Sequence, residues 1–277
     1  MRLEPRTCPP AEMSTQPQSR MISLIEELNE IRRKGGADQF TLRRIKNDAG
    51  NLKSNPLEYR QAMGMIAAVE GNPGEMRKHY KIAQEISPDN LYVRQNLPSA
   101  LRHFGFYQEA RDILNEFHDH LRGDAEFLKV YLRNLYETGR FNAALKTIDE
   151  LKALQPVGPI AKETLIGEIA EFIESSDITE DDVEGLERVI EQFLQEKKIY
   201  GWVVEYELLS DEESTTLVGD VLLWNTIEET VKLIMELGRR MAGLDLPENV
   251  VNTIHFHLKS RETLENGDYA DRATQVL

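Results

Sequence analysis

Apolar residues in the first half of the chain recur every three or four positions, which is the spacing of amphipathic helices. A first stripe consists of Ile22, Ile25, Leu28 and Ile31. A second stripe consists of Phe40, Leu42, Ile45, Ala49 and Leu52. Gly35 and Gly36 interrupt the pattern between the stripes, and Pro56 follows the second one. This segment therefore predicts two helices joined by a glycine turn.

Three glycines divide the next part of the chain into units of equal length. Gly71, Gly105 and Gly139 are each 34 residues apart. At fixed distances after each glycine the residue is small or apolar: Met76, Ala110 and Ala144 at five, Tyr80, Leu114 and Ile148 at nine, and Ala83, Phe117 and Leu151 at twelve. Glycine adopts a left-handed backbone without penalty, so it can end the first helix of a unit. Proline lacks a backbone N–H, so Pro88 and Pro156 are expected to end the second helix.

This pattern resembles the tetratricopeptide-repeat family, most clearly over residues 131–156. Three units cover about residues 57–156, and a degenerate unit precedes them. Gly64 occupies the family's small position in the first unit, whereas Arg122 departs from the pattern where other units have proline. The resemblance implies a mostly α fold in which residues 21–156 form a solenoid of antiparallel helix pairs.

The resemblance also implies a concave groove that binds a segment of a protein partner and is lined by the first helix of each unit. The positions that it places in this groove are Gln61, Met65, Tyr92, Gln95, Asn96, Ser99, Lys129, Arg133 and Tyr136. Tyrosine and arginine often anchor protein interfaces. An ordinary solvated surface is the alternative interpretation of each position taken singly.

A helical period continues beyond the repeats, but without their glycine and proline marks. It covers residues 159–175 and 180–197. Thr179 and Asp182 form a variant of the capping box, which marks the start of a helix. We expect residues 157–198 to cap the solenoid or to bridge it to the segment that follows.

The period then changes from 3.6 to 2, which predicts strands. Trp202, Val204, Tyr206 and Leu208 alternate with residues of the other strand face. The loop SDEES separates this strand from a second one in TTLVGDVLLW, which favours a hairpin. Residues 226–243 predict an amphipathic helix, and alternation returns in VVNTIHFHL. Residues 199–260 therefore predict a small α+β C-terminal module.

The two ends of the chain lack these patterns. Residues 1–20 are rich in proline, serine and glutamine and show no periodicity, so we expect a disordered tail. Residues 261–277 are mostly polar and are expected to fray.

The whole chain has a formal net charge of −15, and its acidic residues are concentrated in the second part. Residues 1–156 hold 23 basic and 21 acidic side chains, whereas residues 157–277 hold 10 basic and 27 acidic ones. Such a part repels phosphate backbones and attracts basic protein surfaces. The candidate acidic surface consists of Glu205, Glu207, Asp211, Glu212 and Glu213. Solubility alone is the other explanation of this acidity.

Motifs for enzymatic chemistry are lacking, because the sequence has no nucleotide-binding glycine loop, nucleophile elbow or HExxH zinc motif. His255 and His257 would share one face of a strand and could bind a metal with acidic partners, but a hydrated strand face is the plainer explanation. Cys8 is the only cysteine and lies in the proline-rich tail, where nothing would orient a base beside it. We therefore predict no catalytic residue, no metal and no cofactor.

Together these observations predict a cytoplasmic, non-enzymatic adaptor that binds a protein or peptide in its groove. A single cysteine is typical of a reducing compartment, and no apolar run is long enough to span a membrane. An alternative is a regulatory inhibitor that neutralises a basic protein through the acidic module. A third hypothesis is an enzyme at the face of His255 and His257. Self-association through the hairpin edge also stays open, whereas binding to nucleic acid or membranes is not expected.

Ala144 tests the register of the repeats. The second helix of the third unit faces its partner helix at this position, so a glutamate there would be a buried charge. We expect Ala144→Glu to unfold the third unit and to lower the melting temperature measured by circular dichroism. An unchanged melting curve would contradict the register.

Overall fold

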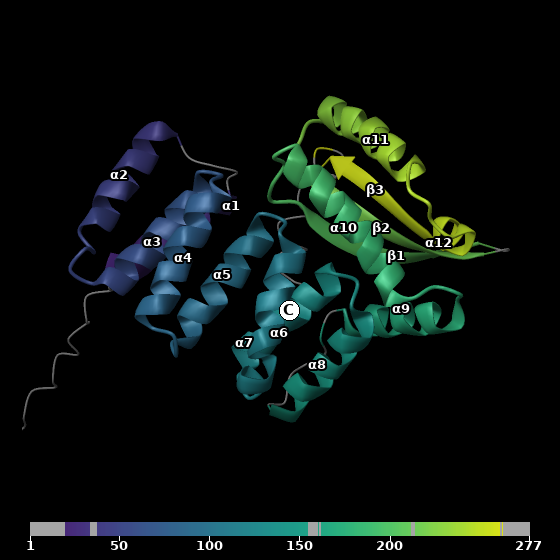
Figure 1. The fold of residues 1–277 in the computed structure, drawn as a ribbon, viewed down its shortest axis with the longest axis horizontal. Coiled ribbons are helices and arrows are strands. Elements are labelled where there is room, and N and C mark those ends of the chain that lie inside the picture. Colours follow the sequence, from purple (N-terminus) through teal and green to yellow (C-terminus); the bar gives the residue numbers. More distant parts are fainter. Residues whose placement is uncertain are drawn as a thin grey trace, which may run out of the picture.

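The computed structural model describes residues 20–33, 38–154, 160, 162–211, 214–260 and 262. Its first eight helices are α1 (Arg20–Arg33), α2 (Gln39–Gly50), α3 (Pro56–Val69), α4 (Pro73–Ile86), α5 (Leu91–His103), α6 (Tyr107–Leu121), α7 (Ala125–Glu137) and α8 (Phe141–Leu154). The elements that follow are α9 (Glu163–Ser175), α10 (Glu180–Glu196), β1 (Val203–Ser210), β2 (Thr215–Leu223), α11 (Ile227–Ala242), α12 (Glu248–Thr253) and β3 (Ile254–Ser260). The fold is thus mostly helical, with a small sheet near its C-terminal end (Figure 1).

The helices α1 to α8 form a stack of antiparallel pairs. From α3 onward, each helix packs against the next one in the chain, and α3, α5 and α7 also contact one another in succession. We call the row formed by α3, α5 and α7 the inner row. The helix α1 extends this row, because it packs against α3. The arrangement confirms a stack of helical repeats, with α1, α3, α5 and α7 along one side.

Local sequence signals set where these helices begin and end. Helices α3, α4, α5 and α7 each begin after an Asn or Asp whose side chain accepts a backbone N–H of the first turn: Asn55, Asn72, Asn90 and Asp124. Gly71, Gly105 and Gly139 have φ angles of 69°, 76° and 63° and lie in the left-handed region. After each glycine, the next residue donates its N–H to the carbonyl five residues earlier, at 2.9 Å. This hydrogen bond is the signature of a Schellman C-cap.

The repeated small positions are where paired helices touch. Met76, Ala110 and Ala144 are fully buried, as the register predicts. In the first unit, a Cβ atom on Gly64 would lie 2.9 Å from the Tyr80 ring, so the glycine lets α3 and α4 approach closely. The packing of these residues agrees with the sequence register of all three units.

The C-terminal module contains a three-stranded sheet in the order β1-β2-β3. Strands β1 and β2 are antiparallel, whereas β3 lies parallel to β2 after the crossover through α11 and α12. Trp202, Val204 and Tyr206 are buried on one side, which confirms the predicted alternation. That side faces the helices, and Figure 1 shows α10 and α11 beside the sheet.

Two predicted boundaries in this module were wrong. Ser210 pairs with Thr215, so the hairpin loop is one residue shorter than predicted. Residues 250–253, which open the predicted strand, belong to α12 and not to a strand. An alternating pattern over so short a segment does not distinguish a strand from one helical turn. Glu248 in the first turn favours the helix electrostatically.

Two residues of the second half rest on the glycine turns of the stack, namely Val183 of α10 and Trp202, which precedes β1. A Cβ atom on Gly105 would overlap the indole of Trp202, and one on Gly139 would lie 2.7 Å from Val183 Cγ1. The Trp202 ring also stacks edge-on against Tyr107, with centroids 4.7 Å apart. Tyr107 Oη donates a hydrogen bond to the Trp202 carbonyl. Stack and module therefore share one hydrophobic core.

The predicted tails, residues 1–20 and 261–277, lie almost wholly outside the described residues. None of the described helices combines the length and the apolar character that a bilayer crossing requires.

Gly105 and Gly71 form a matched pair that tests the contact between stack and module. Both have a left-handed backbone, but a Cβ atom on Gly71 would meet no atom of the described residues within 4 Å. We expect Gly71→Ala to cost about 1 kcal/mol of unfolding free energy from backbone strain alone. Gly105→Ala should cost roughly 1–3 kcal/mol more, because the methyl group displaces Trp202. Urea unfolding followed by circular dichroism measures the difference, and equal losses would contradict the contact.

Candidate functional site

The inner row of helices carries a depression of about 250 Å³. It is lined by Ile25 and Leu28 of α1, Met65, Ala68 and Val69 of α3, Tyr80 of α4, and Asn96, Ser99, Ala100 and His103 of α5. We call this depression the inner groove. Its α1 and α3 walls are apolar, and its polar side chains come from α5 and from Tyr80 of α4.

Helical spacing explains why these residues meet. Asn96, Ser99 and His103 lie three and four positions apart, so they project from one side of α5. Met65 and Val69 are related in the same way on α3. A mainly apolar depression of this kind suits an apolar side chain of a bound peptide. The few polar groups of the depression can hydrogen-bond to the peptide backbone or to polar atoms beside that side chain.

Three of the nine predicted groove residues line this depression, namely Met65, Asn96 and Ser99. Gln61 and Gln95 are half-buried on the same helices but do not line it. The Gln95 amide nitrogen is buried without a hydrogen-bond partner among the described residues. The side chain of Tyr92 lies outside the described residues.

The third unit does not extend the inner groove, because its predicted residues make contacts within the chain. Tyr136 is buried, and its hydroxyl accepts the backbone N–H of Tyr206 at 2.9 Å. Arg133 Nε donates to Glu137 at 3.2 Å, and Lys129 pairs with Glu126 at 2.6 Å. The prediction that Tyr136 lines the groove for a partner is therefore wrong. Strand β1 covers this position, which the repeat pattern leaves open.

Some residues of the candidate acidic surface make contacts within the chain. Glu205 forms an ion pair with Lys162, which also lies over the Tyr136 ring. Glu207 and Asp211 are exposed, and Asp211 accepts the Ser214 N–H across the hairpin loop. Glu212 and Glu213 lie outside the described residues.

Further acidic residues of the second half meet the stack itself. Glu184 on α10 forms a bidentate ion pair with Arg111 on α6, with N–O distances of 2.7 and 2.8 Å. Arg140 bridges Glu184 and Asp181, the latter at 2.6 Å. The Arg111 and Glu184 side chains are about nine-tenths buried or more. Two arginines of the helix stack thus pair with acidic side chains of α10 within one chain.

Two more carboxyl groups of α10 are buried beside these ion pairs. Glu191 accepts hydrogen bonds from the Gln108 backbone N–H at 3.3 Å and the Gln195 amide at 2.8 Å. The oxygens of Glu187 have no partner among the described residues. Burial raises the pKa of Glu191 to about 7 and the pKa of Glu187 well above its usual range, because a water-poor environment disfavours the charged form. Burial also opposes ionisation of Glu184, but Arg111 and Arg140 lower its pKa to about 2.

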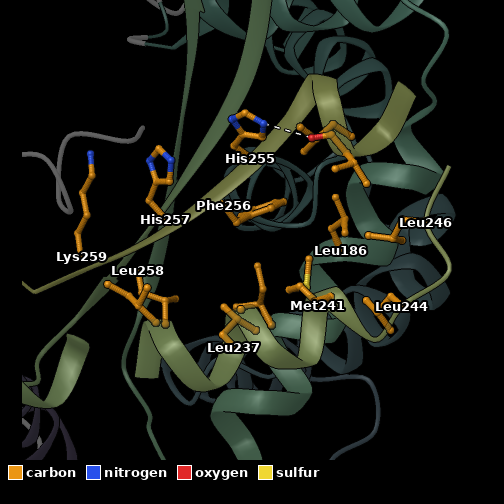
Figure 2. A pocket seen from close by; sticks show the side chains of 16 residues that line it. Leu186, Leu237, Met241, Leu244, Leu246, His255, Phe256, His257, Leu258 and Lys259 are labelled. Atoms are coloured by element: carbon orange, nitrogen blue, oxygen red, sulfur yellow. Dashed lines mark hydrogen bonds between the residues drawn. The ribbon is translucent and has the colours of Figure 1, made fainter. Parts of the chain in front are cut away.

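A second depression, of about 810 Å³, lies between β3, α10 and α11. Figure 2 shows Phe256 and Leu258 of β3 on the same side as Leu237 and Met241 of α11. Leu186 and Ile190 of α10, together with Leu244 and Leu246, add further apolar walls. We call this depression the module cleft. Sequence reasoning missed it, because its walls come from segments that only the sheet topology brings together.

The histidines of β3 point away from the apolar side of the module cleft (Figure 2). His255 Nε2 lies 3.2 Å from the Val251 carbonyl, and His257 Nδ1 lies 3.5 Å from Asp220 Oδ1. Asp220 also pairs with Lys259. Across the described part of the chain, no three His, Cys, Asp or Glu side chains are grouped so that they could hold a metal ion. The outer face of β3 is therefore a polar strand face with one shared carboxylate.

Comparison with protein-family models, with curated proteins and with solved structures finds no match to this chain.

The buried carboxyl groups predict an unusual dependence of stability on pH. Because the folded-state pKa of Glu191 lies above its ordinary 4.5, its contribution to stability is greatest below that value and is lost as the pH rises through about 7. Glu187 acts in the same direction. We expect Glu191→Gln and Glu187→Gln to raise the urea midpoint at about pH 8 and to leave it nearly unchanged at about pH 4.

Glu184→Gln is the control, because the pKa of Glu184 is shifted in the opposite direction. This substitution should lower the urea midpoint at about pH 8, since it leaves the buried Arg111 without its charge partner. A gain in stability from Glu184→Gln, or a loss from Glu191→Gln, would contradict the assignment.

Proposed function

We propose that this chain is a non-enzymatic adaptor that binds a segment of a protein partner in its inner groove. The observation that supports this function is the meeting of Met65, Asn96 and Ser99 from two successive repeat units in one depression. The resemblance to tetratricopeptide repeats also predicts that a partner binds on this inner surface. The cytoplasm is the proposed location, consistent with the single cysteine.

The size of the inner groove indicates how the partner is held. A volume of about 250 Å³ suits one or two large apolar side chains rather than a whole small molecule. We propose that an apolar anchor of the partner enters between α1, α3 and α5. Asn96 and Ser99 would then hydrogen-bond to polar atoms beside the anchor, and such central, desolvated contacts carry most of the energy of an interface.

Neutralisation of a basic protein by the acidic module remains the alternative function. The internal pairs of Glu184 and Glu205 leave fewer acidic groups for an external partner. This alternative predicts an association that weakens steeply with salt, whereas an apolar anchor predicts one that persists.

A substitution that fills the inner groove tests the proposal. Ser99→Trp places a bulky side chain in the depression, and we expect partner capture by the full-length protein from native lysate to fall about tenfold, which corresponds to ~1.4 kcal/mol. Mass spectrometry identifies the captured protein, and a salt gradient during elution distinguishes apolar from electrostatic binding.

Glu116→Trp is the matched control, because it adds the same side chain at an exposed position of α6, outside the groove. It should leave capture unchanged, and melting curves confirm that both variants are folded. A partner retained equally by the wild type and by Ser99→Trp would contradict the inner groove as the site. A basic partner released early in the gradient would favour neutralisation.

A further inference from the structure

The sheet of the C-terminal module has one open edge. Among the described residues, β3 pairs with β2 alone and lies at the end of the strand order β1-β2-β3. The opposite edge is covered, because Tyr206 of β1 donates its backbone N–H to Tyr136 Oη of α7 at 2.9 Å. An uncovered strand edge presents a row of backbone N–H and C=O groups that another strand can pair with.

The module cleft follows this open edge. It is lined by every residue from Ile254 to Lys259, and these residues belong to both faces of β3. Phe256 and Leu258 face the apolar side of the cleft, whereas His255 and His257 point away from it (Figure 2). A depression lined by consecutive residues of both faces runs along the edge of the strand. A strand added there would place every second side chain in the cleft.

Neighbouring residues keep space open beside the edge. A Cβ atom on Gly219 of β2 would lie 2.3 Å from Phe256 Cε1, and the Phe256 ring also packs edge-on against Tyr206 of β1, with centroids 6.2 Å apart. Phe256 is thereby directed across the sheet and away from the open edge. On the other wall, Gly238 and Ala242 of α11 carry little or no side chain. The resulting volume of about 810 Å³ has room for several side chains.

The charges on the outer face of the sheet indicate the chemistry of an added strand. Glu205 of β1 lies beside Asp220 of β2, which lies beside His257 of β3. Asp220 serves both His257 and Lys259, and His255 forms no ion pair within the described part of the chain. This face therefore changes from acidic at β1 to basic at β3. Because opposite charges on neighbouring strands stabilise a sheet, acidic side chains suit the position beside β3.

A second copy of β3 does not meet this requirement. In an antiparallel pair centred on His257, His255 would lie opposite Lys259 of the second copy. In a pair centred on Phe256, His255 would lie opposite His257 of the second copy. Basic side chains directly opposite each other destabilise a strand pair. The basic edge thus disfavours pairing with itself and favours an acidic strand of another protein.

We propose that the open edge of β3 binds an extended segment of a partner protein in which apolar residues alternate with acidic ones. The backbone of the segment adds a fourth strand, its apolar side chains enter the module cleft, and its acidic side chains face His255, His257 and Lys259. Main-chain hydrogen bonds supply affinity in this mode of recognition, and the pockets for alternate side chains supply specificity. The site is separate from the inner groove, which is formed by α1, α3, α4 and α5, and does not depend on it.

Selection of short random peptides displayed on phage, with the immobilised full-length protein as the target, tests the chemistry of the occupant. We expect enriched sequences in which apolar residues occupy every second position and Asp or Glu lies between them. No enrichment over an uncoated surface, or enriched sequences without this alternation, would overturn the proposal.

A substitution that fills the module cleft tests the place of binding. In Gly238→Trp, the Kd of the tightest selected peptide, measured by fluorescence anisotropy, should rise at least about tenfold, because the indole occupies the cleft. Gly167→Trp on α9 is the matched control and should leave the Kd unchanged. A Cβ atom at either glycine meets no described atom within 4 Å, and only Gly238 lines the cleft. Equal Kd values for the wild type and Gly238→Trp would overturn the proposal.

Opposite charge changes at His255 test the acidic side chains of the partner. His255→Lys should lower the Kd of the selected peptide, and His255→Glu should raise it, each by about two- to fivefold. A Kd that neither substitution changes would contradict acidic residues beside β3.

Residue-resolved hydrogen exchange tests the addition of a strand. Saturating peptide should slow the exchange of alternate backbone amides of β3, because the amides between them already pair with β2. Protection confined to α11 would overturn the proposal. Slow exchange of all β3 amides in the free full-length protein would assign the edge to another segment of the same chain and would also overturn it.

Discussion

The left-handed glycine turns at Gly105 and Gly139 are the constraint on which the rest of the structure depends. Each turn ends an inner helix and lets the chain reverse into the next one. Each also leaves a surface without a Cβ atom, on which Trp202 and Val183 rest directly. Gly71 has the same turn, but no residue in the described part of the chain covers it. The place of the C-terminal module is therefore set by backbone geometry that first serves the repeats.

Ion pairs also hold α10 against the helix stack, and the same contact buries carboxyl groups whose ionisation is disfavoured. The second half of the chain is strongly acidic, and its α10 binds the basic side chains Arg111 and Arg140 of the stack. Glu187 and Glu191 are buried in the same region, where ionisation is disfavoured. The acidity that looked like a surface for an external partner is thus partly a complement to the first half of the same molecule.

These internal contacts decide which surfaces remain for partners. The third unit is closed by β1, so the inner groove is confined to α1, α3, α4 and α5. In the other part of the molecule, the large apolar residues of α11 that stay exposed are Ile227, Val231, Ile234 and Met235.

Sequence alone determined the repeat units, because the 34-residue spacing of glycines and buried small residues is a local requirement of paired helices. The resemblance to tetratricopeptide repeats, combined with the helical period, also placed Met65, Asn96 and Ser99 on the inner side. Only the tertiary structure decided that Tyr136 is buried under Tyr206, which is seventy residues further along the chain. Only it joined β3, α10 and α11 into the module cleft. Local patterns state which face of an element is apolar, whereas the partner of that face depends on contacts between segments far apart in the sequence.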